Sequence, residues 1–330
     1  MTQPFPRSLN RRAHLALLLV GSLLTSHAIA QGFPSKPIKL VVPFPPGGGT
    51  DIIAREIANK VATQQGWTIV IDNKPGSGGN LGVDVAAKAA PDGYTLVIGQ
   101  TSNLAINPTL YAKLPYNPEK DLAAIGLVAS APLVLVVAAD SPYKTLADVV
   151  AVAKAKPDAL NYASSGSGTV AHLAAEQFQK VAGVRFTHVP YKGAAQGVTD
   201  LIGGQIQMYM SSVPTLIGHI RNGKMRALAV TSLKRTDDLP NVPTVAESGY
   251  KGFEAVTWFG IVGPAAMPKD AIAKLNAAFN KALDTPEVQH KLGAQGADVV
   301  SGTPEKFTEL IRSETTRWAP LVKSSGARVD

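Results

Sequence analysis

The stretch Pro43-Phe44-Pro45-Pro46-Gly47-Gly48-Gly49-Thr50-Asp51 decides the fold class, because it joins a strand pattern to a helix pattern. The apolar run at 38–42 predicts a buried strand, and the apolar spacing at 52–61 predicts a helix. Thr50 is the predicted N-cap of that helix. The glycines let a ligand approach N–H groups that carry partial positive charge, which predicts a small-anion site. A tight strand-to-helix turn that binds nothing is the alternative.

Similar junctions recur along the chain. Each has a short apolar or mixed strand pattern, then small polar residues, then a helical pattern, and the polar segments lie at 100–103, 164–169, 191–193 and 211–212. In open α/β sheets, ligands bind beyond the carboxyl ends of the strands. The repetition therefore favours the ligand-binding interpretation of the glycine-rich loop.

The first thirty residues have the pattern of a signal peptide. A positively charged start precedes an apolar run at 13–24, and Ala28-Ile29-Ala30 forms a cleavage site. We expect cleavage after Ala30 and export; a short membrane anchor is the alternative. Arg11-Arg12 resembles a twin-arginine signal, but His14 stands where that pattern prefers Phe, so ordinary secretion is favoured.

The composition indicates a protein with a conventional core. The chain has no cysteine and 45% hydrophobic residues, and the roughly 300 residues left after cleavage suit two domains. Three of its 32 basic residues lie in the leader, which leaves 29 against 24 acidic residues. These charges are scattered, with no basic run that carries interleaved aromatic residues. Nucleic acid is therefore not an expected partner.

Strand and helix patterns alternate along the mature chain, which predicts an α/β fold. Two long apolar runs, at 131–138 and 253–263, are predicted to cross between lobes. They divide the chain into a discontinuous first domain, residues 31–131 and 254–330, and a second domain, residues 132–253. A cleft would lie between these domains. Residues 107–124, which are rich in Pro, Asn and Tyr, are predicted to form a long connection.

Catalytic, metal and cofactor sites are not expected. The chain lacks a Gly-x-Ser-x-Gly elbow, and its histidines have no metal-ligand spacing. Gly166-Ser-Gly168-x-x-Ala171 fits a dinucleotide fingerprint, but no acidic residue follows at the expected distance. His172 opens a helix beside the 164–169 loop, where packing of that loop is favoured over contact with a ligand.

Several motifs in order along the mature chain resemble those of the Bug receptors, the solute-binding proteins of tripartite tricarboxylate transporters. They include the opening glycine-rich loop and the segments at 73–80, 91–96, 164–169, 189–193, 240–249 and 258–260. This resemblance implies a periplasmic protein with the two-domain, type II-like periplasmic binding-protein fold. It also implies a monomeric receptor that binds a small carboxylate, closes its lobes over it and delivers it to two membrane subunits.

The resulting hypothesis is a non-enzymatic receptor without cofactor or metal. Donors of the 43–51, 76–79 and 101–103 loops would hold the carboxylate, with Phe44 as an apolar wall or a cover of its loop. Second-domain residues, among them Thr169, Tyr191, Lys192 and Ser211, would contact the distal part of the ligand. The predicted site residues are Phe44, Pro46, Gly47, Gly48, Thr50, Asp51, Gly78, Thr101, Ser102, Asn103, Ser164, Ser165, Gly166, Thr169, Tyr191, Lys192, Gly193 and Ser211.

One residue departs from the family pattern. Ser211 stands where many relatives have Asp. Without that carboxylate a ligand ammonium group loses an acceptor, so a di- or tricarboxylate or an aromatic acid is favoured over an amino acid. An exported α/β hydrolase and a sensor that docks a membrane kinase are the alternative functions.

Overall fold

The computed structural model describes residues 32–327 and 329. It divides into a short unit, residues 1–35, and a main unit, residues 36–330. The predicted signal peptide lies outside the described residues, and residues 32–35 contain no helix or strand. Among the described residues, all helices and strands belong to the main unit, and none of these helices is long and apolar enough to cross a membrane.

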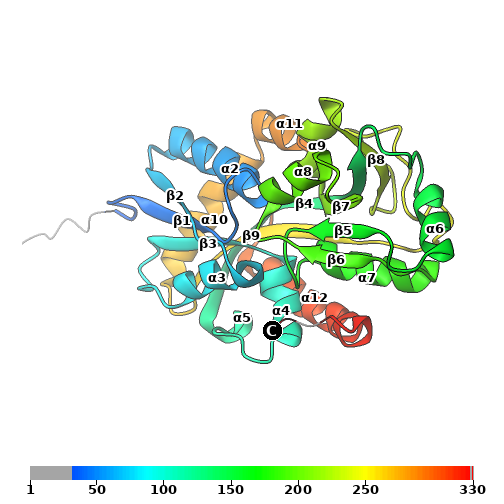
Figure 1. The fold of residues 1–330 in the computed structure, drawn as a ribbon. Coiled ribbons are helices and arrows are strands. Elements are labelled where there is room, and N and C mark those ends of the chain that lie inside the picture. The colour runs from blue at the N-terminus through cyan, green and yellow to red at the C-terminus, as the bar shows by residue number, and fades with distance from the viewer. Residues whose placement is uncertain (1–31, 328, 330) are drawn as a thin grey trace, which may run out of the picture. The chain divides into compact units, whose positions relative to one another are not determined.

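A ten-stranded sheet runs through the main unit (Figure 1). The strands in hydrogen-bonded order are β2 (Ile69–Asn73), β1 (Ile38–Val42), β3 (Thr95–Gln100), β9 (Val256–Pro264), β4 (Leu122–Ala138), β7 (Met208–Ser212), β5 (Asn161–Ser164) and β6 (Thr187–Pro190). Two more strands, β8 (Met225–Val230) and β10 (Asp298–Val299), also pair with β4. At each end of the order the strands are parallel, whereas β9 and β4 run antiparallel to their neighbours.

Strand β4 belongs to both halves of this sheet. Its residues 122–132 pair with β9, and residues 133–138 pair with β7 and β8. The sequence predicted the apolar run at 131–138, but the strand begins at Leu122 because its first part pairs with β9. The predicted connection at 107–124 was wrong, since it contains two short helices and the start of β4. The second predicted crossing corresponds to β9; the domain boundaries themselves stay a prediction.

The helices begin and end near the residues that the sequence indicated. Long helices pack beside the sheet: α2 (Gly49–Gln65), α3 (Asn80–Ala87), α6 (Leu146–Ala155), α7 (Val170–Ala182), α8 (Ala194–Ile202), α9 (Val213–Arg221), α10 (Lys269–Leu283), α11 (Pro286–Gly293) and α12 (Pro304–Ser325). Short helices lie in two of the predicted ligand loops and in the segment 107–124 that was predicted to be a connection. They are η2 (Ser77–Gly79), the π-helical η3 (Ser102–Ile106), α4 (Asn107–Leu110) and α5 (Pro118–Asp121).

Helix α12 connects two hydrophobic cores. Phe307 and Ile311 in its first half belong to the core around β1, β3 and β9, whereas Trp318 and Val322 belong to the core around β5 and α7. Between them, buried Glu314 accepts hydrogen bonds from the indole nitrogens of Trp258, at 3.2 Å, and Trp318, at 3.0 Å. Because the carboxylate satisfies both indoles, the helix can lie across the two cores without leaving a buried donor unpaired.

We predict that Gly260→Ala destabilises the protein by about 1–3 kcal/mol, the usual cost of overpacking a core. A Cβ at this β9 position would overlap the ring of Phe307 on α12. Gly218→Ala is the matched control, because its Cβ at an exposed position of α9 would meet nothing within 4 Å and should raise helix stability by about 0.5–1 kcal/mol. Urea unfolding measures the free energy of unfolding of both variants. Equal stability of the two variants would contradict the packing described for α12.

Candidate functional site

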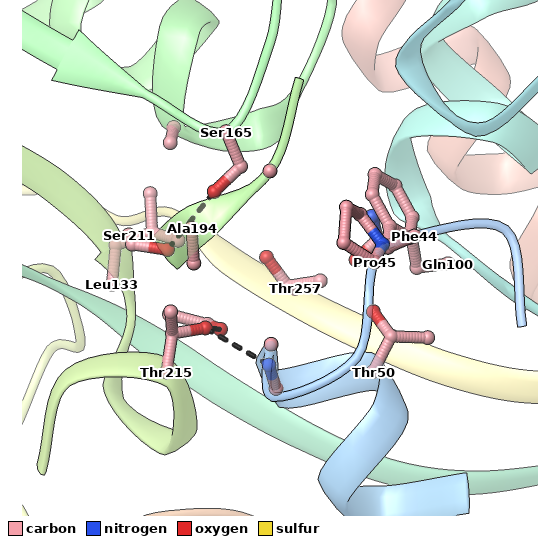
Figure 2. Close-up of a pocket in the computed structure, with 15 residues that line it drawn as sticks. Phe44, Pro45, Thr50, Gln100, Leu133, Ser165, Ala194, Ser211, Thr215 and Thr257 are labelled. Carbon is pink, nitrogen blue, oxygen red and sulfur yellow. Dashed lines mark hydrogen bonds between the residues drawn. The ribbon is translucent and has the colours of Figure 1, made fainter. Parts of the chain in front are cut away.

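A small cavity of about 50 Å³ lies where the starts of four helices meet the ends of several strands (Figure 2). None of the residues that line it carries a formal charge. They are Phe44, Pro45, Gly48, Gly49, Thr50, Gln100, Leu133, Ser165, Ala171, Gly193, Ala194, Ser211, Ser212, Thr215 and Thr257. The cavity is therefore a neutral, hydroxyl-rich site with apolar walls.

The first turns of α2, α7, α8 and α9 all reach this cavity. Gly49, Ala171 and Ala194 lie in the first turns of α2, α7 and α8, and Ser212 is the N-cap of α9. Each helix start contributes partial positive charge from N–H groups that have no intrahelical acceptor. No acidic side chain lines the cavity to offset this charge, so its electrostatics favour an anion.

The start of α2 leaves donors available at the cavity. Gly48, not the predicted Thr50, is the N-cap, and its carbonyl accepts from the amides of Asp51 and Ile52. Within the described residues, the amides of Gly48 and Thr50 have no protein acceptor. The Thr50 hydroxyl is likewise unbonded there, and Figure 2 shows its oxygen at the cavity. These three groups offer hydrogen bonds to a carboxylate without first breaking an internal bond.

Two close contacts join the loops on opposite sides of the cavity. The Gly49 amide donates to Thr215 Oγ1 at 3.1 Å, and a Cβ at Gly49 would lie 2.8 Å from Ser212 Oγ. At the second contact, a Cβ at Gly193 would overlap the ring of Pro45. Glycine at these positions therefore permits the loops after β1, β6 and β7 to approach closely.

A chain of hydroxyl groups forms another wall. Ser165 Oγ lies 3.1 Å from the Tyr209 hydroxyl and 3.4 Å from Ser211 Oγ. Burial raises the pKa of Tyr209 above its ordinary value of 10, although hydrogen bonds with the two serines act in the other direction. The phenol therefore stays neutral, and the chain can donate to a ligand oxygen through Ser165 or Ser211.

Asp51 organises the glycine-rich loop from behind. Its buried carboxylate accepts from the Gly47 amide at 3.0 Å, Arg55 Nε at 2.9 Å and Asn73 Nδ2 at 2.9 Å. Burial acts to raise the pKa of Asp51, but these hydrogen bonds and the charge of Arg55 lower it below 3.8. Asn73 also donates to the Phe44 carbonyl at 3.0 Å, so Asp51 and Asn73 together fix both ends of the loop.

Six predicted site residues line the cavity: Phe44, Gly48, Thr50, Ser165, Gly193 and Ser211. The others lie around it. Pro46 and Gly47 belong to the same loop as Phe44, while Ser164, Gly166 and Thr169 form hydrogen bonds within the loop that carries Ser165. Tyr191 donates to Asp200 at 2.6 Å, and Lys192 is exposed. The ligand roles of all these residues stay predictions.

The loops at 76–79 and 101–103 lie behind the cavity wall. Thr101 Oγ1 accepts from the Trp258 amide, and Asn103 Oδ1 accepts from the Gln100 amide. A Cβ at Gly79 would lie 2.6 Å from Asn103 Nδ2 and 3.0 Å from the Phe44 ring. Phe44 thus stands between these loops and the cavity, and Gly78, Thr101, Ser102 and Asn103 do not line it.

Sequence reasoning missed several lining residues. Ser212, Thr215 and Thr257 add hydroxyl groups, and Pro45, Gly49, Gln100, Leu133, Ala171 and Ala194 complete the lining. The position of Ser212 beside Ser211 at a strand end was a usable signal, whereas Thr257 on β9 and Leu133 on β4 reach the cavity through the pairing of these strands. Among the described residues, no group of three or more His, Asp or Glu is arranged to hold a metal ion.

This α/β fold is that of the two-domain periplasmic binding proteins. Solved structures of that class match closely. The periplasmic binding protein BugD is 34% identical, with a TM-score of 0.86 and coverage of 90% of this chain and 99% of that one. Residues 53–327 match the family model described as the tripartite tricarboxylate transporter family receptor, TctC, and the chain belongs to this family.

Relatives support this assignment over nearly the whole chain. A UPF0065 protein of Pseudomonas sp. strain P51 is 41% identical over 96% of this chain and 94% of its own length. BugT of Bordetella pertussis is 36% identical over 96% of this chain and 98% of its own length. The chain is thus a periplasmic solute-binding receptor of the TctC type, and this Bug-type resemblance was already visible in the sequence motifs.

Two similar structures have named ligands. The R. palustris protein Rpa4515 with adipate is 34% identical, with a TM-score of 0.87 and coverage of 90% of this chain and 100% of that one. MatC from Rhodopseudomonas palustris with bound malate is 33% identical, with a TM-score of 0.83 and coverage of 88% and 100%.

We predict that Asp51→Asn destabilises the protein by about 1–3 kcal/mol at pH 7, because an amide cannot accept the same charge-assisted hydrogen bonds. The lowered pKa of Asp51 means that its carboxylate stabilises the fold above pH 3.8, and that this stabilisation is lost as the pH falls through the folded-state value. Urea unfolding from pH 7 to pH 3 should show the two proteins converging at the acid end. A stability difference that does not change with pH would contradict this role.

Proposed function

We propose that this receptor captures a small di- or tricarboxylate or aromatic acid, closes over it, and delivers it to the two membrane subunits of a tripartite transporter. The observation that carries the proposal is the uncharged cavity at the starts of α2, α7, α8 and α9. A carboxylate there would receive N–H and O–H donors while supplying the negative charge that the lining lacks. The family assignment supports the transporter partner.

Neutral donors are sufficient to bind such a ligand. Each hydrogen bond to a charged group contributes roughly 1.5–3 kcal/mol, and each helix start adds about 0.3–1 kcal/mol. The free amides of Gly48 and Thr50, with the Thr50 hydroxyl, would supply three such bonds. The proteins with adipate and malate support an acid as the ligand class.

The size of the cavity bears on how a ligand enters. Ligand pockets for drug-sized molecules measure about 300–1,000 Å³, well above the roughly 50 Å³ seen here. A dicarboxylate would therefore require the contacts Gly49–Thr215 and Gly193–Pro45 to open. We infer a hinge motion of two lobes about β4, which belongs to both halves of the sheet, and its neighbour β9.

A hydrolase is the less favoured function, because a serine nucleophile would need access to substrate. Within the described residues, Ser164 and His188 form the Ser–His hydrogen bond, with 2.7 Å between Oγ and Nε2. Ser164 is fully buried and its hydroxyl also bonds with Gly166, so no substrate carbonyl can reach it in this arrangement. We infer that the protein is not an enzyme.

Thermal shift with acetate, malate, adipate, citrate and benzoate tests the proposal. A ligand at 100 times its dissociation constant should stabilise the protein by about 2.7 kcal/mol, which corresponds to a Tm rise of a few degrees. Adipamide, the neutral diamide of adipate, is the matched control and should give no shift. If no acid shifts the melting curve while an ester is hydrolysed, the receptor proposal is wrong.

Gly193→Ala should separate closure from folding in the same assay. Its Cβ would overlap Pro45 across the cavity, whereas the extended backbone at Gly193 tolerates alanine. We expect an unchanged Tm without ligand and at least a tenfold weaker affinity by calorimetry. Undiminished affinity would show that these loops need not approach during binding.

Ser211→Asp should change the ligand class. Ser211 is almost fully buried at the cavity, so a carboxylate there would repel an acidic ligand and offer an acceptor to an ammonium group. We expect malate affinity to fall at least tenfold while aspartate affinity rises. Ser211→Asn, of equal size but neutral, should change neither affinity strongly; matching losses in both variants would point to sterics instead of charge.

A further inference from the structure

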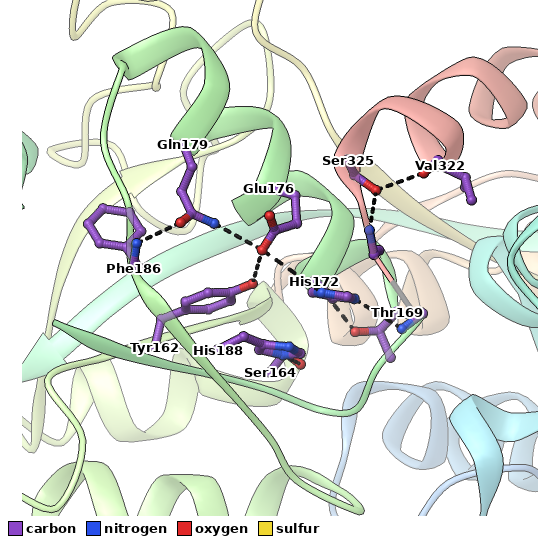
Figure 3. A network of polar contacts seen from close by, with 12 residues as sticks. Tyr162, Ser164, Thr169, His172, Glu176, Gln179, Phe186, His188, Val322 and Ser325 are labelled. Atoms are coloured by element: carbon purple, nitrogen blue, oxygen red, sulfur yellow. Dashed lines mark hydrogen bonds and ion pairs between the residues drawn. The ribbon is translucent and has the colours of Figure 1, made fainter. Parts of the chain in front are cut away.

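Two histidines stack behind the loop that carries Ser165 (Figure 3). The ring centroids of His172 on α7 and His188 on β6 lie 4.1 Å apart, with an angle of 10° between the planes. His188 also stacks on Tyr162 at 4.8 Å. Each histidine forms a hydrogen bond to the segment 164–169, whose Ser165 lines the cavity.

The hydrogen bond of His172 requires a neutral ring. His172 Nδ1 accepts from the Gly168 amide at 3.2 Å, so this nitrogen carries no proton and the proton of the neutral ring sits on Nε2. Protonation would place a hydrogen on Nδ1 that faces the Gly168 N–H. Two donors cannot share this bond, so the cationic ring must release Gly168.

The bond of His188 holds the other end of the segment. His188 Nε2 lies 2.7 Å from Ser164 Oγ, which also accepts from the Gly166 amide at 3.2 Å. Gly166 in turn accepts at its carbonyl from Thr169 Oγ1 at 2.7 Å. Both ends of the Ser165 loop are therefore fixed by one connected set of bonds that includes the two imidazoles.

The surroundings of the stack disfavour positive charge. His172 is only 5% exposed and lies in the first turn of α7, where the helix dipole opposes a cation. Burial lowers the pKa of His172 from 6.5 to about 4; burial and then the neighbouring His172 lower the pKa of His188 to about 3. Two charged rings would repel each other across the stack.

The titratable groups around the stack do not remove this constraint. Glu176 on α7 is the nearest carboxylate, 3.9 Å from His172 Nε2, and is held by Tyr162 of β5 and by Gln179, each at 2.9 Å. The 164–169 loop contributes no charged side chain, and Figure 3 shows α12 presenting Val322 and Ser325 on this side. Glu176 favours a charged His172 ring through its own charge, but it faces Nε2 and cannot replace the bond between Gly168 and Nδ1, and burial still lowers the pKa of His172.

We propose that His172 and His188 are positioning residues for Ser165, and that His172 holds the Ser165 loop only while its ring is neutral, so that mild acid weakens carboxylate binding. This inference rests on the proposed receptor function for its effect on affinity, but the loop rearrangement does not. The pKa of His172 is lowered while it holds the loop, so below pH 6.5 the held loop is destabilised relative to the released loop. This loss of stability is complete near pH 4, where the held ring is itself protonated.

His172→Asn tests the proposal, because its amide oxygen can accept from Gly168 but cannot be protonated. Calorimetry with malate at pH 7 and pH 5 compares it with wild type and with His290→Asn, a variant of an exposed histidine on α11. Both proteins see the same titration of malate, so that effect cancels. One histidine whose pKa is lowered from 6.5 to about 4 shifts the balance towards the released loop by about twentyfold between pH 7 and pH 5. We therefore expect an excess affinity loss of up to about twentyfold in wild type and in His290→Asn. A difference below twofold overturns the proposal.

A second measurement does not depend on the ligand. Hydrogen–deuterium exchange of peptides covering 164–172, corrected for intrinsic rates, should show that wild type loses protection between pH 7 and pH 5. His172→Asn should keep protection, and His188→Gln, which retains a partner for Ser164, should lose less than wild type. Equal loss in wild type and His172→Asn would contradict the proposal. If no acid binds at pH 7, the receptor function fails while exchange still decides the role of the histidines.

Discussion

A peptide N–H at the start of a helix has no acceptor inside that helix, and the cavity depends on this constraint. Four helices begin at its edge, and its lining includes no carboxylate that could neutralise them. Some of these N–H groups have acceptors within the protein, since Asp51 accepts from Gly47 and Thr215 accepts from Gly49. The remaining donors at Gly48 and Thr50 require an external acceptor, which is why the site suits an anion.

The arrangement of β4 and β9 explains how distant segments reach one cavity. Strand β4 belongs to both halves of the sheet, and Leu133 on it lines the cavity together with Thr257 of β9, which pairs with Ala131 of β4. These two strands thus form part of the site. The loops after β1 and β7 meet in the Gly49–Thr215 contact, so the proposed hinge about these strands would change the binding geometry directly.

The sequence predicted the parts of the site that depend on local pattern. The glycine-rich loop, Ser165 and Ser211 follow strand patterns, and the cavity includes all three, because strand ends in an α/β sheet gather at one edge. Thr215 could not be found this way, since it lies inside the first turn of α9 and meets Gly49 through tertiary packing. The loops at 76–79 and 101–103 are at the predicted edge, yet the Phe44 ring places them one layer back. The spacing of residues in the sequence does not indicate whether a loop lies directly at a cavity or behind another side chain.

The local predictions that failed did so by small shifts of register with chemical consequences. Helix α2 begins two residues earlier than the Thr50 cap implied, so Thr50 is inside the first turn and its hydroxyl is directed to the cavity instead of the helix end. Tyr191 stays a predicted ligand residue, and in this structure its hydroxyl donates to Asp200 on α8. A polar residue at a strand end can face either the cavity or its own helix, and only the packed structure decides between them.

Neutrality is the property that unites the cavity with the residues behind it. Serine, threonine and amide donors line the site, Tyr209 stays a phenol, and the bond from Gly168 requires an uncharged His172. A fixed cation would hold an acid in both the open and the closed form, since its attraction acts over several ångströms. Short-range donors on separate elements act together only when those elements lie close to one another. Under the proposed function, opening the contacts at Gly49 and Gly193 would therefore remove much of the affinity at once.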